Sequence, residues 1–299
     1  MTDSADAVPG IDELDAWLAA RERAAGDVRP GAEAGIVWHR DERRRTPLSL
    51  VYLHGFSATR METHPLSERV AEALGANLFH SRLSGHGRTP EAMGEARVEH
   101  WHADAERALA IGRRIGERVV LVGTSTGGTL ATLLATEGDP ALAALVLLAP
   151  NFGPADRRAG LLTWPGARLW VPWIVGRQRI VEPENEGHRQ HWTTTYPSTA
   201  LIPMMQLVRQ VRRASLERIR VPVLALWCDE DQVVDARRTP PTLARMTGAP
   251  VEIERVPAEP DGGVPDPSRH LIAGDIFAPA ATERLARRVL DFLRERIDA

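Results

Sequence analysis

A serine flanked by glycines, at a point where a strand turns into a helix, constrains this chain more than any other feature. The apolar run at residues 119–122 predicts a buried strand, and residues 129–134 have the composition of a helix. Between them lies Gly-Thr-Ser-Thr-Gly at residues 123–127. In so tight a turn bulky neighbours would clash, so the glycines leave the hydroxyl of Ser125 pointing outward. The motif predicts a nucleophile elbow with Ser125 as the nucleophile.

An acidic residue follows another predicted strand. Residues 221–227 form an apolar run, and a polar loop comes directly after it. An acid at the carboxyl end of such a strand can point into a site at that edge of a sheet. We predict Asp231 in this role, because Val233 and Val234 behind it can anchor the loop; Asp229 is the alternative.

One histidine, His270, follows Asp231 in the sequence. It lies in a loop between a strand-like run at residues 251–256 and a helical pattern at residues 280–296. A general base must reach the serine while a carboxylate holds its other ring nitrogen. The chain order serine, aspartate, histidine is the one that this arrangement requires on a parallel sheet.

A sharp turn at His54-Gly55-Phe56 follows an apolar run at residues 48–53. Such a turn leaves backbone amides free to stabilise the negative oxygen of a tetrahedral intermediate. We predict the N–H groups of Phe56 and Thr126 as the two donors. We expect His54 to hydrogen-bond within the turn.

Strand-like and helical segments alternate along the chain, which favours an α/β fold with a mostly parallel sheet covered by helices on both faces. The predicted strands are residues 36–38, 48–53, 77–81, 119–122, 145–148, 223–227 and 251–256. The predicted helices are residues 11–25, 65–74, 101–116, 127–137, 236–246 and 280–296.

The alternation breaks at residues 151–216, which predicts a helical cap inserted into a core formed by residues 1–150 and 217–299. The insertion holds half of the eight tryptophans of the chain. Its large apolar side chains either line a substrate pocket or seat the cap on the core. The candidates for the pocket are Trp164, Trp170, Trp173, Trp192, Met204 and Met205.

Composition excludes several classes of protein. A net charge of −3 and a pI near 6.4 give no electrostatic case for nucleic acid or for an anionic membrane surface. No apolar stretch is long enough to span a bilayer. The absence of lysine excludes a Schiff base, and no metal-binding motif occurs, so we expect neither a metal nor an organic cofactor. The acidic N-terminus and single cysteine favour a cytoplasmic protein.

From about residue 36 to its C-terminus the chain resembles the α/β-hydrolase family, and within it the branch of monoacylglycerol lipases, lysophospholipases and small carboxylesterases. The motifs that carry the resemblance are His54-Gly55-Phe56, Leu83-Ser84-Gly85-His86-Gly87, residues 123–127, Asp231-Gln232-Val233-Val234 and Ser268-Arg269-His270. The resemblance implies a Ser125, Asp231 and His270 triad, with Phe56 and Thr126 forming the oxyanion hole.

These residues predict a serine hydrolase that cleaves small-molecule carboxylic esters of fairly apolar acyl or aryl groups through an acyl-enzyme. Two alternatives stay open. An amidase or peptidase would use the same triad, and a binding protein could keep the fold without the reaction. The sequence does not determine the oligomeric state.

Overall fold

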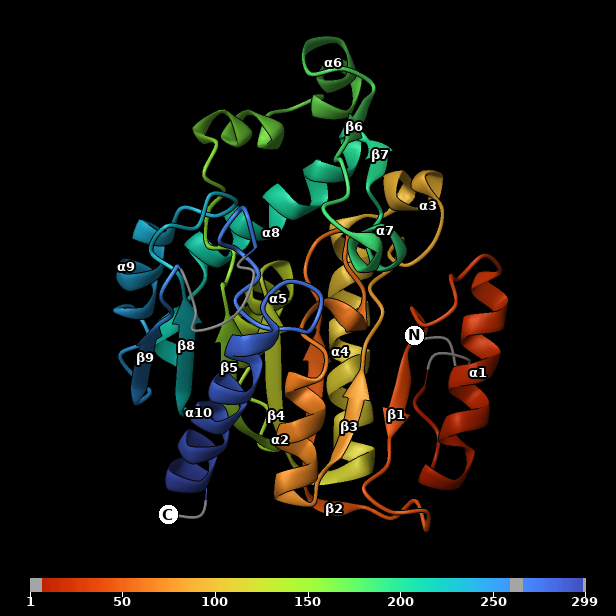
Figure 1. Ribbon diagram of the computed structural model, residues 1–299, viewed down its shortest axis with the longest axis vertical. Helices are drawn as coiled ribbons and strands as arrows, with labels where there is room; N and C mark the ends of the chain where they lie inside the picture. Colours follow the sequence, from red (N-terminus) through yellow and green to blue (C-terminus); the bar gives the residue numbers. More distant parts are fainter. Residues whose placement is uncertain (1–6, 259–265, 298–299) are drawn as a thin grey trace.

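The computed structural model describes residues 7–258 and 266–297. Its centre is a seven-stranded sheet in the order β1-β3-β2-β4-β5-β8-β9, in which β1 runs antiparallel to β3 and every other pair is parallel (Figure 1). The strands are β1 (Gly35–Val37), β2 (Thr46–Leu53), β3 (Asn77–His80), β4 (Gly116–Thr124), β5 (Leu142–Leu148), β8 (Val223–Trp227) and β9 (Val251–Arg255). The central strands are apolar because both of their faces are covered.

Helices cover both faces of this sheet, and alternate strand residues pack against each set. Val51 and Leu121 join one apolar cluster, whereas Leu50 and Val120 join the other. The first face carries α1 (Leu14–Ala25), α4 (Val98–Ile115), α5 (Thr126–Ala135), α8 (Leu201–Arg213) and α9 (Thr239–Leu243). The second carries α2 (Leu66–Leu74) and α10 (Pro279–Ile297).

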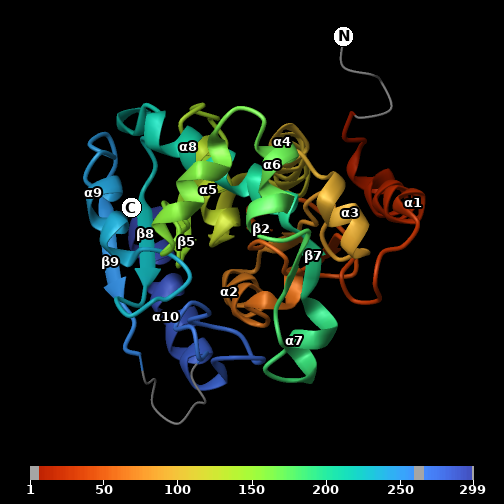
Figure 2. The same cartoon turned by 90° about the horizontal axis from the view of Figure 1, so that it is seen from above.

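The segment between β5 and β8 extends over the carboxyl end of the sheet (Figure 1). Its elements are η4 (Arg157–Thr163), α6 (Ala167–Ile174), β6 (Gln178–Ile180), α7 (Glu186–His191), β7 (Thr195–Pro197), η5 (Ser198–Ala200) and α8. β6 and β7 form a separate antiparallel pair, and β7 lies beside α3 (Pro90–Glu95), as Figure 2 shows from above. Leu207 and Val211 of α8 pack into the apolar cluster of the core, so this helix of the inserted segment also forms part of the core. The division at residues 151 and 216 stays a prediction.

The predicted α/β fold is confirmed, and each predicted strand and helix falls on an observed element. The short 3-10 turns η2 (Ile11–Glu13) and η7 (Ala236–Arg238) begin the first and fifth predicted helices. Helix α3 was not predicted. It has six residues, with Thr89 capping its first turn and a proline at its start, and so short a segment shows little periodicity.

Candidate active site

Ser125 stands at the corner between β4 and α5 with a backbone φ of 51° and ψ of −114°. Residues other than glycine seldom adopt a positive φ, so the surrounding structure must hold this strained corner. A Cβ on Gly127 would lie 1.9 Å from the carbonyl oxygen of Leu53, and a Cβ on Gly123 would lie 2.5 Å from that of Gly127. Both positions therefore need glycine, which is the steric reason that the sequence suggested.

The side chains of Asp231 and His270 meet at the carboxyl edge of the sheet. His270 Nδ1 lies 2.6 Å from Asp231 Oδ2, and both side chains are buried. Asp231 Oδ1 accepts hydrogen bonds from the amides of Val233 and Val234, at 2.8 and 2.9 Å. The valine pair thus holds the carboxylate in place, and the second ring nitrogen of His270 is left for another partner.

Asp229, the alternative acid, is engaged elsewhere. Its carboxylate accepts a hydrogen bond from Trp227 Nε1 at 3.0 Å and forms an ion pair with Arg255 at 2.6 Å. These contacts turn it away from His270, so the geometry favours Asp231.

The charge of Asp231 also changes the acid–base behaviour of His270. Burial disfavours the charged imidazolium, but the charge of Asp231 and its hydrogen bond outweigh burial and raise the pKa of His270 above its ordinary value. Glu62 and Asp266 add to this effect. The site is therefore built to stabilise a positive imidazolium.

Asp266 is a site residue that the sequence analysis missed. Its Oδ2 accepts hydrogen bonds from the amides of His270 at 2.7 Å and Leu271 at 2.9 Å, and from Ser268 Oγ at 2.5 Å. This carboxylate fixes the loop that carries the histidine, in which Arg269 has a φ of 60°. An aspartate two residues before a serine in a turn is the only signal that the sequence offered.

The turn at Gly55 rests on a second missed residue, Glu62. Its Oε2 accepts a hydrogen bond from the amide of Gly55 at 2.7 Å and another from the hydroxyl of Tyr52 at 3.0 Å. The same hydroxyl lies 3.1 Å from Thr124 Oγ1, next to Ser125. The buried network therefore joins the turn to the elbow.

Burial raises the pKa of Glu62 to about 7. Hydrogen bonds from Gly55 and Tyr52 and the nearby His270 oppose the rise. The carboxyl group consequently changes charge close to neutral pH, within the electrostatic reach of the histidine. Glu62 ends the short 3-10 helix η3 (Arg60–Glu62), and the sequence around it gave no signal of this role.

As expected, His54 hydrogen-bonds within the turn, and it also contacts the loop that follows β3. Its Nδ1 lies 2.9 Å from the carbonyl oxygen of Gly55, and its Nε2 accepts a hydrogen bond from the amide of Leu83 at 3.1 Å. Burial lowers the pKa of His54 to about 4. It is neutral and structural at ordinary pH.

The predicted oxyanion donors have their amides unengaged. Among the described residues, neither the N–H of Phe56 nor that of Thr126 donates a hydrogen bond. The amide of Thr126 begins α5, where an N–H has no partner within the helix. Within the same residues Ser125 Oγ forms no hydrogen bond either.

The predicted pocket residues of the cap occupy three different environments. Trp192 is buried with Ala58, Leu271 and Phe277, in a cluster beside His270. Trp170, Met204 and Met205 pack within the cap or between cap and core. Trp164 and Trp173 are 62% and 81% exposed. Trp164 lines an open surface pocket of about 500 Å³ together with Met205, and the role of the six candidates in substrate binding stays a prediction.

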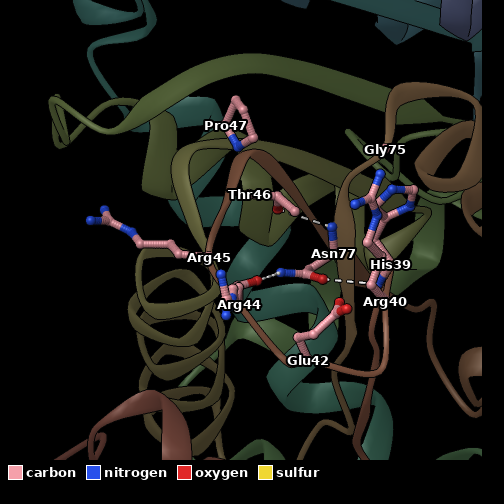
Figure 3. Close-up of a pocket in the computed structure, with 9 residues that line it drawn as sticks. All are labelled: His39, Arg40, Glu42, Arg44, Arg45, Thr46, Pro47, Gly75 and Asn77. Carbon is pink, nitrogen blue, oxygen red and sulfur yellow. Dashed lines mark hydrogen bonds between the residues drawn. The ribbon is translucent and has the colours of Figure 1, made fainter.

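A pocket of about 390 Å³ lies at the opposite end of the sheet, where β2 and β3 begin (Figure 3). It is lined by His39, Arg40, Glu42, Arg44, Arg45, Thr46, Pro47, Gly75 and Asn77. Asn77 organises this end, since it accepts from the amide of His39 and donates to the carbonyl oxygen of Arg44. None of the proposed catalytic side chains reaches it.

Known proteins share this architecture. Residues 50–285 match the model described as "Alpha/beta hydrolase family", and the chain belongs to that family. It is similar to a thermostable monoacylglycerol lipase from Bacillus sp. (strain H-257), with 27% identity over 188 residues, or 63% of this chain and 72% of that lipase.

Solved structures share the fold. One from the metagenome-derived lipolytic enzymes LipS and LipT has a TM-score of 0.71 at 20% identity, covering 90% of this chain and 99% of that one. A soluble variant of monoglyceride lipase from Saccharomyces cerevisiae has a TM-score of 0.65 at 14% identity, covering 89% and 93%. The predicted family is confirmed, and the named relatives agree with the predicted class of carboxylic ester hydrolase.

Proposed function

We propose that this protein hydrolyses carboxylic esters of fairly apolar acyl or aryl groups, with Ser125 as nucleophile, His270 as general base and Asp231 as its orienting acid. The observation that carries the proposal is the buried contact of 2.6 Å between His270 Nδ1 and Asp231 Oδ2, at the sheet edge that also bears the strained Ser125. The similarity to a monoacylglycerol lipase supports the same chemistry.

The reaction follows from these groups. With Nδ1 held as a donor to Asp231, Nε2 of His270 accepts the proton of Ser125 as its oxygen attacks the carbonyl carbon. The amides of Phe56 and Thr126 donate to the oxyanion. His270 then protonates the leaving alcohol, and a water molecule repeats the cycle to release the acid.

The acyl group is the apolar part of the proposed substrate. The buried cluster of Ala58, Trp192, Leu271 and Phe277 adjoins His270, so the surroundings of the site are apolar.

No helix within residues 7–258 or 266–297 is both long and apolar enough to cross a bilayer. The cytoplasmic location stays a prediction.

Initial rates on a chain-length series of p-nitrophenyl esters and one anilide would test the proposal, with the native protein beside Ser125→Ala. We expect ester turnover to fall by about 10³-fold or more in the variant, because the nucleophile is lost. Unchanged turnover would exclude Ser125. Turnover of the anilide alone would favour the amidase alternative, and no turnover by either protein would favour a binding protein.

A further inference from the structure

The chain between α1 and β1, residues 26–34, contacts the cap through one arginine. Arg29 Nη1 donates hydrogen bonds to the carbonyl oxygens of Gln190, at 3.1 Å, and Trp192, at 2.9 Å. Its Nη2 donates to Thr193 Oγ1 at 3.3 Å. These acceptors lie at the end of α7 and directly after it, where carbonyl groups lack partners within the helix and arginine side chains often supply them.

No carboxylate accompanies this guanidinium group. Arg29 forms no ion pair within the described residues, and its Nε is buried there without a hydrogen-bond partner. Burial lowers the pKa of Arg29, because the charged form is disfavoured away from water. The three hydrogen bonds to residues 190–193 therefore offset the cost of burying the charge.

The segment that carries Arg29 is itself held on the core. The amide of Arg29 donates to the carbonyl oxygen of Gly87 at 2.8 Å. Two residues later, the carbonyl oxygen of Gly31 accepts a hydrogen bond from Arg60 Nε at 3.1 Å. Residues 50–285 match the family model, so this segment supplies a contact with the cap from outside the matched region.

Thr193 joins the cap to the turn that carries one of the proposed oxyanion donors. Its amide donates to the carbonyl oxygen of Ser57 at 2.7 Å, and its side chain is buried. Ser57 has a φ of 63° and directly follows Phe56. A residue other than glycine keeps such a φ only where surrounding contacts hold it. A shift of Thr193 would therefore be transmitted to the amide of Phe56.

Trp192 makes the equivalent contact with the loop of the proposed general base. Its ring packs edge to face against Phe277, with 5.5 Å between the ring centroids, in the buried cluster that includes Leu271. Leu271 directly follows His270 in the sequence. Through two adjacent cap residues, Arg29 is thus connected to both halves of the proposed active site.

We propose that Arg29 is a positioning residue whose role rests on the proposed function: it fixes residues 190–193 of the cap against the turn at residues 55–57 and the loop of His270. Without the guanidinium group, residues 190–193 lose three hydrogen bonds to the core. The amide of Phe56 and the ring of His270 are then free to leave the geometry that the transition state needs. Such a loss lowers kcat more than it raises KM.

Steady-state kinetics of Arg29→Ala on the best ester of the chain-length series test the proposal. We expect kcat to fall by about 10- to 100-fold while KM changes by less than about threefold. Arg29→Lys keeps a charged donor and should retain more of the rate. Added guanidinium ion, at a concentration well below denaturing, should restore part of the lost kcat in Arg29→Ala, whereas the same concentration of sodium chloride should not.

Arg245→Ala is the matched control. The guanidinium group of Arg245 is also partly buried and also donates to two carbonyl oxygens at the end of a helix, those of Arg212 and Ala214 at the end of α8. Arg245 contacts neither the turn at residues 55–57 nor the loop of His270. Its loss should leave kcat within about threefold of the native value.

Hydrogen exchange at the amide of Thr193, followed by mass spectrometry, measures the contact without turnover. We expect exchange at least about threefold faster in Arg29→Ala and unchanged in Arg245→Ala. A native protein that cleaves no ester would refute the proposed reaction, while exchange would still decide whether Arg29 holds the cap. Unchanged exchange, faster exchange with an unchanged kcat, or equal losses of kcat in both variants would overturn the positioning role.

Discussion

The catalytic edge of the core and the outer end of the cap, residues 157–181, differ in which side chains they bury and which they expose. At the catalytic edge, polar groups are buried and held by protein: the carboxylate of Asp231 accepts two amides, and that of Glu62 accepts an amide and a hydroxyl. At the outer end of the cap, the apolar side chains of Leu169, Trp173 and Ile174 are 77%, 81% and 71% exposed.

The contrast separates two kinds of constraint. A buried polar group without its partner costs about 1–3 kcal/mol, so the network of the core fixes one geometry for one reaction. An exposed tryptophan such as Trp173 contributes little to folding, so the fold places no comparable constraint on the outer end of the cap. The following predictions test each side of that contrast.

Asp231→Asn should have the largest effect. An amide at this position cannot stabilise the imidazolium of His270 and favours the wrong ring tautomer, so kcat for the best ester should fall by about 10³- to 10⁴-fold. Asp229→Asn is the matched control and should keep its rate within about threefold, because Asp229 contacts Arg255 instead. Equal losses in both variants would contradict the assignment of the acid.

Glu62→Leu should lower kcat by about 10²-fold with little change in KM. The substitution leaves the amide of Gly55 without its acceptor, which lets the neighbouring N–H of Phe56 shift away from the oxyanion. Glu62→Gln keeps an acceptor oxygen and should retain most of the rate. Steady-state kinetics on one ester would compare the two, and a rise in KM alone in Glu62→Leu would point to a substrate-binding role.

The pH dependence of kcat/KM reports the charge of His270. The reaction needs neutral imidazole, and the pKa of His270 is raised above about 6.5, so the rate should rise with pH through that higher value and fall about tenfold per pH unit below it. Because Glu62 helps to raise this pKa, Glu62→Gln should move the acidic limb to lower pH. A movement to higher pH, or none, would contradict the coupling.

The smallest predicted effect is a difference in stability between substitutions on the buried and the exposed side of α6. Val171→Ala should lower the free energy of unfolding by about 2 kcal/mol, because it opens a cavity among the buried cap residues that include Leu162, Ile202 and Val208. Leu169→Ala, on the exposed face, should change it by less than about 0.5 kcal/mol. Urea denaturation of both variants measures this difference, and equal losses would show that the outer face also contributes to folding.

The sequence predicted the parts of the protein whose signals are local. The glycines around Ser125 predict its place at a strand-to-helix corner, and short apolar runs between turn residues predict the strands. Asp231 could be distinguished from Asp229 because Val233 and Val234, two and three residues later, anchor its loop and donate their amides to it.

The residues that the sequence did not reveal meet their partners only in the folded structure. Glu62 meets Gly55 and Tyr52 only after the chain turns, and no motif surrounds it. Trp173 was predicted either to line a substrate pocket or to seat the cap on the core, because the insertion is too small for a core of its own, but its side chain is 81% exposed. Helical spacing places Val171 and Trp173 on different faces, but it does not say which face the core covers.

The strained backbone at Ser125 lowers the stability of the fold, although the proposed reaction needs this residue. A backbone φ of 51° is more favourable for glycine than for serine. Substitution of Ser125 by glycine would therefore stabilise the fold by about 1 kcal/mol but would remove the nucleophile. Directed evolution that selects for heat resistance alone would therefore tend to discard the one hydroxyl on which the proposed activity depends. A screen for thermostable variants of this protein must score turnover at the same time.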